Sequence, residues 1–337
     1  MLTRLPHCLI ILSTLLATGC TWSPQQTGSR TNRQSPAIPG PVNYLPAPAK
    51  LSPGTFRDSL SHDSRSRTFV VHVPPSYNPD TPTPVVLMFH GFPGSGSEFE
   101  NITGMDQNSD HEGFIVVYPD GFGTVRLRTW NAGTCCGPAM ESNIDDVGFV
   151  SSLIDYLSTK ANVDPKRVYA AGMSNGAMLC HRLGCELSAR IAAIGAVSGT
   201  IMIDSCSPSQ PVPIIMIHGT DDAAVPWNGG EGSGLPGLVF TSVPRTVEIW
   251  KKANRCTGDR QTPYMEMAHM IAEYQGDCPD GADVVLCTIE GGTHLWPGPI
   301  SFIVRFLHEG VQSNPREQPI FSANEILWKF FQEHPMQ

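Results

Sequence analysis

The sequence predicts an α/β protein in which helices cover both faces of a mostly parallel sheet. Two observations lead to this class. From about residue 53 onward, short apolar runs alternate with longer helical stretches, which is the pattern of a parallel sheet with crossover helices. In addition, a glycine-flanked serine at 172–176 follows one apolar run and precedes a helical stretch. The second feature also indicates a chemical function for the fold.

Length and composition predict one folded domain. The 337 residues can bury a large core, and 40% hydrophobic with 16% charged residues is ordinary for a soluble domain. The formal net charge is −9. The few Lys and Arg residues are scattered rather than clustered, so nucleic acid is excluded as a partner.

The first twenty residues are interpreted as a signal peptide. Arg4 gives a positive start, and the apolar stretch 8–17 is too short to span a bilayer. The stretch ends in a string that resembles a bacterial lipobox, in which Cys20 would be lipidated and become the mature N-terminus. Ala17 departs from the usual lipobox residue, so plain secretion is the alternative. Either way, we expect the protein to leave the cytoplasm, and lipidation would attach it to a membrane.

Residues 21–52 are expected to be a proline-rich linker, because their Pro, Ser, Thr, Gln and Gly composition cannot bury enough apolar surface to fold. The catalytic domain would then span residues 53–337. Within it, the apolar runs predict a series of strands and the serine motif follows one of them. The expected strands are 68–73, 84–90, 114–118, 167–171, 191–197, 213–217 and 284–289.

Two helices carry capping signals. Asp145 and Asp146 precede an apolar helical pattern that extends to Leu157, so they are expected to cap that helix. Ser322 and Glu325 have the spacing of a capping box and predict a last helix through Phe331.

Eight cysteines remain after Cys8 and Cys20, an even number that favours disulfides over metal binding in an exported domain. No spacing matches a zinc site, and no motif implies a cofactor. Cys256 and Cys278 are expected to pair and to tie down a loop-rich insertion before Val284. Cys185 with Cys206 is a second pair, and Cys135 or Cys136 is expected to pair near the active site.

The motif Gly172-Met173-Ser174-Asn175-Gly176 fits a nucleophile elbow, the strained strand-to-helix turn of the α/β-hydrolase fold. Small flanking residues allow the serine Oγ to stand exposed over the sheet. The alternative is a tight structural turn with a surface serine. The apolar strand before the motif and the helix after it favour the elbow.

A serine hydroxyl needs a histidine to take its proton and an acid to orient that histidine. In this fold the chain order is serine, acid, histidine. His294 follows the strand 284–289 through a glycine-rich turn and is the expected base, whereas His181, His218 and His308 are interpreted as packing or surface residues. The strand 213–217 leads to Asp221 and Asp222, one of which is the expected acid unless both serve only to stabilise a turn.

The developing negative charge of acyl transfer needs preorganised N–H donors. The residue after the nucleophile, Asn175, is expected to supply one backbone N–H. Phe92, in the glycine loop that begins at His90, is expected to supply the other. The imidazole of His90 is interpreted as structural rather than catalytic.

Six motifs in order resemble the secreted esterase family that groups feruloyl esterases, acetylxylan esterases and poly(3-hydroxybutyrate) depolymerases. The resemblance covers about residues 53–337. The motifs are Leu87-Met88-Phe89-His90-Gly91, Trp130-Asn131 with Cys135-Cys136, Asp145-Asp146-Val147-Gly148-Phe149, the serine motif, His218-Gly219-Thr220-Asp221-Asp222 and Gly291-Gly292-Thr293-His294-Leu295-Trp296-Pro297-Gly298. The acid ends the His-Gly-Thr-x-Asp string in that family, which favours Asp222 over Asp221.

The resemblance implies a serine carboxylic-ester hydrolase with feruloyl or acetylxylan esters as substrates. Phe92, Trp130 and Trp296 are candidates to line the substrate cleft, with core packing as the alternative for each. The stretch 299–321 looks longer than usual for the family and could shape the cleft. A polyester depolymerase and a non-catalytic binding protein of the same fold are the rival interpretations. The oligomeric state does not follow from the sequence.

Overall fold

The structure is a computed structural model that describes residues 45–46, 49–124, 127–234, 237–267, 269–298 and 321–337. Its described strands form an eleven-stranded sheet and a separate two-stranded one. In sheet order, the large sheet consists of β1 (Leu45–Pro46), β2 (Gly54–His62), β3 (Arg65–Val73), β5 (Ile115–Pro119), β4 (Thr83–Phe89), β6 (Val163–Met173), β7 (Ala193–Val197), β8 (Ile214–Gly219), β13 (Val284–Ile289), β12 (Met270–Asp277) and β11 (Thr257–Met267). The small sheet pairs β9 (Gly230–Glu231) with β10 (Val239–Phe240).

The central strands are parallel and the flanking ones are mostly antiparallel. From β5 through β4, β6, β7 and β8 to β13, each strand runs parallel to its neighbour. The pairs β2 with β3, β3 with β5, β12 with β13 and β11 with β12 are antiparallel. Because the six central strands run in the same direction, the loops that follow them meet at one edge of the sheet.

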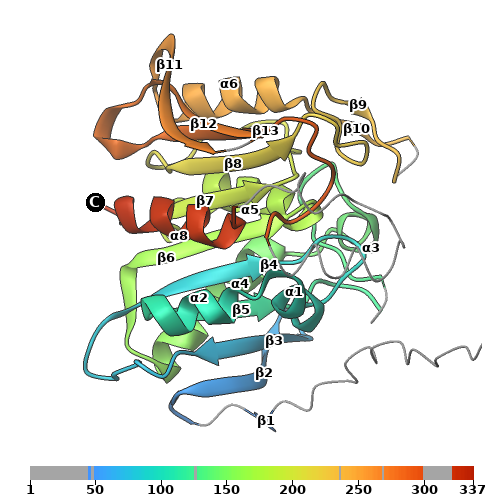
Figure 1. Cartoon of the computed structure of the whole chain (residues 1–337). Coiled ribbons are helices and arrows are strands. Elements are labelled where there is room, and N and C mark those ends of the chain that lie inside the picture. Colours follow the sequence, from blue (N-terminus) through green and yellow to red (C-terminus); the bar gives the residue numbers. More distant parts are fainter. Residues whose placement is uncertain (1–44, 47–48, 125–126, 235–236, 268, 299–320) are drawn as a thin grey trace, which may run out of the picture. The chain divides into compact units, whose positions relative to one another are not determined.

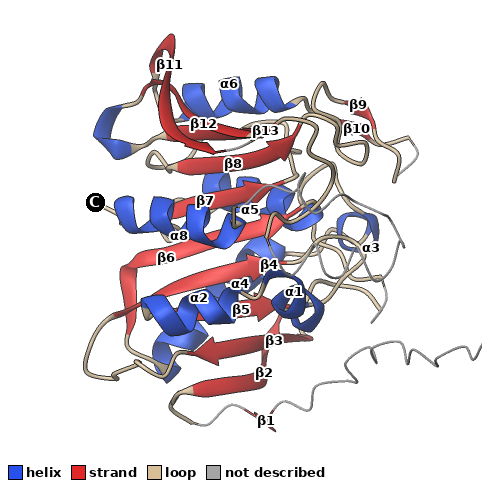
Figure 2. Cartoon of the chain, in the orientation of Figure 1, coloured by secondary structure: helices blue, strands red, loops and turns tan. Residues whose placement is uncertain are grey.

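Helices cover both faces of the sheet, as Figures 1 and 2 show. One face packs on α1 (Gly96–Thr103), α2 (Met105–Glu112) and α8 (Ala323–Glu333), and the other on α4 (Asp146–Lys160), α5 (Asn175–Glu186) and α6 (Val243–Ala253). Short helical segments lie at α3 (Gly137–Glu141) and η1 (Pro279–Gly281). The predicted fold class is therefore confirmed: this is an α/β-hydrolase type of sheet with helices on both faces.

The sequence of β4 shows why the layers form. All seven residues of this strand are buried, and successive side chains enter opposite cores. Val85, Leu87 and Phe89 belong to the core beneath α4, α5 and α6, while Val86 and Met88 belong to the core beneath α1, α2 and α8. A central strand that is apolar on both faces is stable only between two helical layers.

Part of the segment 21–52, predicted as a linker, pairs with the sheet. Leu45–Pro46 pairs with Phe56 and Arg57 of β2, and Leu51 is buried with its N–H donated to the Lys160 carbonyl 2.9 Å away. The part of the predicted linker that the structure describes is thus bound to the domain through backbone pairing, which composition alone does not reveal.

The segment between Cys256 and Cys278 is a β-hairpin rather than a loop-rich insertion. Its strands β11 and β12 pair antiparallel with register shifts near Thr257 and Pro263, and β12 extends the main sheet beside β13. These irregularities and the mixed polar composition hide the period of two on which strand prediction depends.

The two capping predictions have different outcomes. The Asp145 side chain caps α4 by accepting the Gly148 N–H at 2.8 Å. Ser322 is the N-cap of α8, but its side chain accepts no capping hydrogen bond. The helix begins where the capping box predicts although the predicted reciprocal bonds do not form.

Candidate active site

Ser174 lies in a sharp turn between β6 and α5. Its backbone has φ 54° and ψ −123°, and its N–H donates to the Val197 carbonyl 2.9 Å away in the adjacent strand. A side chain at either flanking glycine would not fit: a Cβ on Gly172 would lie 2.6 Å from the Gly176 carbonyl carbon, and one on Gly176 would contact the Phe89 and His90 carbonyls. The turn therefore needs both glycines and has the geometry of a nucleophile elbow.

His294 and Asp222 meet in the loops that follow β13 and β8. His294 Nδ1 lies 2.8 Å from Asp222 Oδ2, and the other carboxylate oxygen accepts the N–H groups of Ala224 and Val225 at 2.9 and 2.8 Å. Asp221 is exposed, and its backbone N–H donates to the Gly292 carbonyl. Of the two adjacent aspartates, Asp222 is the one bonded to the imidazole.

Close backbone packing brings these two loops together. A Cβ on Gly219 would lie 2.8 Å from the Gly292 Cα, so only glycine allows this approach. Thr220 Oγ1 accepts the Gly291 N–H at 2.9 Å, which adds a second connection. The acid and the histidine are thus held by a fixed junction between neighbouring strands β8 and β13.

The carboxyl group of Asp222 remains ionised although it is buried. Burial acts to raise its pKa, but the hydrogen bonds with His294 and with the Val225 N–H hold the pKa below its ordinary value. His218 Nε2 lies 3.4 Å from Asp222 Oδ2. A buried carboxylate in this state can orient an imidazole and stabilise its protonated form.

The loop after β4 lies beside Ser174. A Cβ placed on Gly91 would be 3.3 Å from Ser174 Cβ and 4.0 Å from Ser174 Oγ. Asn175 is the first residue of α5, where backbone N–H groups have no partner within the helix. The Phe92 and Asn175 N–H groups that the sequence nominates as oxyanion donors thus belong to the two segments that border Ser174.

The three competing histidines in the described part of the chain are buried and neutral. Burial lowers the pKa of His90 and of His181 to about 4 in each case, and it lowers that of His218 as well. His90 Nε2 accepts the Gly121 N–H, and His181 Nδ1 accepts the Trp250 indole N–H. These rings serve packing and hydrogen bonding, whereas His308 lies outside the described residues.

Trp130 and Trp296 are buried in the structure. Their exposed fractions are 0% and 2%, and their indole N–H groups donate to the His90 carbonyl and to Asn324 Oδ1, each at 3.0 Å. This burial favours the core-packing alternative for both, since a side chain without exposed surface does not contact a substrate in this arrangement. Phe92 is partly buried.

The structure contains both disulfides expected from the sequence, Cys185–Cys206 and Cys256–Cys278. Cys135 and Cys136 pair with each other. Cys180 and Cys287 are free and buried, and burial raises the pKa of both thiols. Two other predictions, lipidation of Cys20 and a cleft-shaping role for 299–321, concern segments outside the described residues, apart from buried Phe321.

A second Ser, His and Asp group lies away from the elbow. His62 Nδ1 is 3.0 Å from Ser152 Oγ, and His62 Nε2 is 3.0 Å from Asp145 Oδ2. Ser152 lies in the middle of α4, where its hydroxyl also contacts the Gly148 carbonyl and the helix uses its own backbone N–H groups. Because Ser152 lies inside a helix rather than in a strand-to-helix turn, this group provides a comparison for Ser174.

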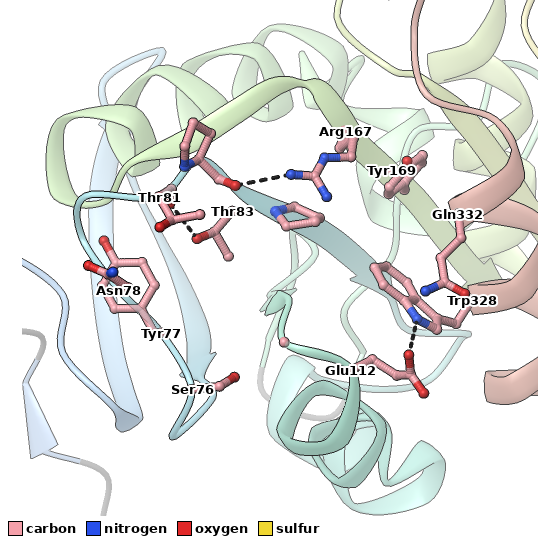
Figure 3. Close-up of a pocket in the computed structure, with 13 residues that line it drawn as sticks. Ser76, Tyr77, Asn78, Thr81, Thr83, Glu112, Arg167, Tyr169, Trp328 and Gln332 are labelled. Carbon is pink, nitrogen blue, oxygen red and sulfur yellow. Dashed lines mark hydrogen bonds between the residues drawn. The ribbon is translucent and has the colours of Figure 1, made fainter.

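A pocket of about 450 Å³ lies at the opposite end of the central strands. Figure 3 shows Arg167 of β6 donating to the Pro82 carbonyl, and Trp328 of α8 donating to Glu112. Neither the serine nor the histidine and acid described above line this pocket. Within the described ranges, no group of three or more His, Cys, Asp or Glu side chains could hold a metal ion.

Comparison with known proteins agrees with the fold and the motifs. The family model described as "Esterase PHB depolymerase" matches residues 68–226, which include the elbow and Asp222. Feruloyl esterase B of Piromyces equi is 33% identical over 235 residues, which cover 68% of this chain and 42% of that protein. The bifunctional acetylxylan esterase/xylanase XynS20E of Neocallimastix patriciarum is 30% identical over 178 residues, or 53% of this chain and 25% of that protein.

Among solved structures, the acetyl xylan esterase from Aspergillus awamori is similar with a TM-score of 0.51 and 14% identity, covering 72% of this chain and 93% of that one. At this identity the likeness concerns the fold alone. The chain spans less than half the length of the two sequence relatives above. The predicted resemblance to the esterase family is nevertheless confirmed by the family model and by the relatives.

Proposed function

We propose that the chain is a serine carboxylic-ester hydrolase whose triad consists of Ser174, His294 and Asp222. The observation that carries the proposal is the 2.8 Å contact between His294 Nδ1 and Asp222 Oδ2. The loops that hold these two residues and the turn at Ser174 all follow parallel strands, so they lie at the same edge of the sheet. The names of the relatives support the class of reaction. Both sequence relatives are named as esterases.

Each residue of the proposed site has one role in the reaction. With Nδ1 bonded to Asp222, His294 has Nε2 available to take the Ser174 proton as Oγ attacks the ester carbonyl. The N–H groups of Phe92 and Asn175 stabilise the negative oxygen. Protonated His294 then delivers its proton to the alcohol that leaves, and an acyl-enzyme remains. Water, deprotonated by the same histidine, releases the acid and restores Ser174.

The proposed substrates are esters of carbohydrates or phenolic acids, with feruloyl and acetylxylan esters first. This choice depends on the printed activities of the relatives, a feruloyl esterase and an acetylxylan esterase. The description of the family model favours a second candidate, hydrolysis of a hydroxybutyrate polyester. Both candidates need the same triad and differ only in the ester.

A fluorophosphonate probe tests the mechanism, because only an activated serine reacts. The wild-type protein is expected to be labelled and to hydrolyse methyl ferulate or acetylated xylan, and Ser174→Ala is expected to lose both properties. Ser152→Ala is the matched control, since Ser152 also contacts a histidine that contacts an aspartate. That variant should retain full labelling and turnover.

The outcomes separate the candidates. Labelling of Ser174→Ala at the wild-type rate would contradict the mechanism, and failure to label the folded wild-type protein would favour a non-catalytic binding protein. If the enzyme clears hydroxybutyrate polymer but leaves methyl ferulate and acetylated xylan intact, the polyester assignment replaces the carbohydrate one.

We also propose that the protein is exported, with residues 1–20 as the signal and lipidation at Cys20. The disulfides of the folded domain support an oxidising compartment. No helix in the described ranges is long and apolar enough to cross a membrane. Expression in a bacterium with labelled fatty acid tests the proposal: label should enter the wild-type protein and not Cys20→Ser.

A further inference from the structure

We infer that Trp130 is a positioning residue that holds the two proposed oxyanion donors at a fixed separation. The inference rests on the proposed function and adds a residue to it. Trp130 is fully buried and cannot touch the substrate, yet its backbone and its indole contact the two segments that carry the donors.

The backbone of Trp130 is bonded to the side chain of Asn175. Trp130 N–H donates to Asn175 Oδ1 at 2.7 Å, and Asn175 Nδ2 donates to the Trp130 carbonyl at 3.0 Å. Two reciprocal bonds between one amide side chain and one residue's backbone fix both position and orientation. Asn175 is 1% exposed, so these bonds form away from competing water. The segment at Trp130 thereby restrains the residue that supplies one donor.

The indole of Trp130 reaches the other segment. Its Nε1–H donates to the His90 carbonyl at 3.0 Å, directly before Gly91 and Phe92. The His90 ring holds the same segment, because Nδ1 lies 2.7 Å from the Gly91 carbonyl and Nε2 accepts the Gly121 N–H at 3.0 Å. The low pKa of His90 is consistent with a neutral ring that donates at Nδ1 and accepts at Nε2.

A buried ion pair restrains the segment that contains Trp130. The next residue, Asn131, donates its N–H to Asp146 Oδ2 at 2.8 Å, and Asp146 Oδ1 accepts from Arg67 Nη2 at 2.6 Å. Arg67 and Asp146 are 4% and 0% exposed. The guanidinium carbon also lies 5.8 Å from the centre of the Trp130 ring. These contacts therefore restrain the position of Trp130 between the two segments that carry the donors.

Oxyanion donors stabilise charge only if their N–H groups are about 3 Å from the developing oxygen, and loss of one donor costs roughly 100-fold to 1,000-fold in kcat. A bridge that sets their separation should matter in the transition state and not in substrate binding. Trp130→Phe removes the indole N–H and keeps the aromatic ring and the backbone contacts. We expect kcat to fall about 10-fold to 100-fold while KM changes less than about twofold.

A transition-state analogue gives the readout that a purely structural role would not move. A boronic acid that forms a tetrahedral adduct at Ser174 should bind Trp130→Phe more weakly by the same factor as the loss in kcat. Trp250→Phe is the matched control. Trp250 is also 0% exposed, and its indole N–H donates at 2.9 Å to a neutral acceptor, His181 Nδ1. That variant should show a comparable loss of unfolding free energy with wild-type kcat and boronate affinity.

A second variant decides the question if Trp130→Phe does not fold. Asn175→Ala keeps the proposed backbone donor and removes both bonds to Trp130, so it should also lower kcat and boronate affinity with little change in KM. The double variant should be less impaired than the product of the two single effects, because both changes release the same bridge. Wild-type kcat in the folded variants, or equal effects in Trp250→Phe, would overturn the inference. Failure of the proposed function differs from this, because the wild-type enzyme itself would then lack Ser174-dependent turnover.

Discussion

Asp221 and Asp222 show how strongly one position along the chain decides the role of a carboxylate. Asp222 is 4% exposed and contacts His294, Ala224 and Val225, whereas Asp221 is exposed beside Thr220. The turn after β8 places one side chain inside the junction with the histidine loop and the other outside it. The proposed orienting role therefore belongs to only one of two chemically identical neighbours.

Asp222→Asn is expected to lower kcat about 10,000-fold, because an amide does not hold the imidazole in the catalytic tautomer or stabilise its protonated form. Asp221→Asn, which removes the adjacent exposed carboxylate, should change kcat less than about threefold. Steady-state hydrolysis of a soluble ester by both variants, with circular dichroism as the check on folding, measures the difference. Equal losses, or a larger loss for Asp221→Asn, would transfer the role.

Contacts between loops that follow neighbouring strands can be predicted from local sequence, whereas contacts between distant segments cannot. Short motifs after strands predict that His294 and Asp222 lie close together, and the structure places His294 Nδ1 2.8 Å from Asp222 Oδ2. Trp130 bonds to His90 and Asn175, which are 40 and 45 positions away. The sequence shows a tryptophan at position 130, but it does not show which carbonyl accepts the hydrogen bond from its indole.

Among the elements, the β6–α5 elbow has a strict steric requirement. Its glycines are not interchangeable with alanine, because the β4 and α5 backbones approach too closely. Strands of the parallel centre were predicted within a few residues because each contains a continuous apolar run. The β11–β12 hairpin and β1 were missed, since irregular register and backbone pairing leave no apolar period.

Gly176→Ala is expected to destabilise the elbow and abolish turnover. Its Cβ would contact the Phe89 and His90 carbonyls, and backbone atoms cannot move aside as a flexible side chain can. We expect a loss of several kcal/mol in unfolding free energy. Gly234→Ala is the control, because nothing lies within 4 Å of an added Cβ there. Urea unfolding and ester hydrolysis measured together would contradict the steric argument if both variants behaved like the wild-type protein.

At the scale of the whole molecule, the two helical layers bury histidines that remain neutral. His90 follows β4 and accepts the Gly121 N–H, and His181 lies on α5 and accepts the indole N–H of Trp250 in α6. Burial lowers the pKa of each to about 4 from an ordinary value of 6.5. Each ring accepts a hydrogen bond at one nitrogen, so protonation would replace an acceptor by a second donor in the interior.

The stability of the whole domain is therefore expected to fall as the pH drops from 6.5 to 4. In this window the unfolded chain binds a proton at each histidine and the folded chain does not, so the contribution is complete above 6.5, decreases below it and levels off near 4. Each ring accounts for about 3 kcal/mol at most. The carboxylates with lowered pKa, such as Asp222, act in the same direction but only at lower pH.

Unfolding in urea at several pH values between 7.5 and 4, with disulfides intact, measures the slope. His181→Gln should make the slope shallower, because it removes one of the two rings whose pKa burial lowers to about 4. A free energy of unfolding that stays constant across this range would contradict the neutral state assigned to the buried rings.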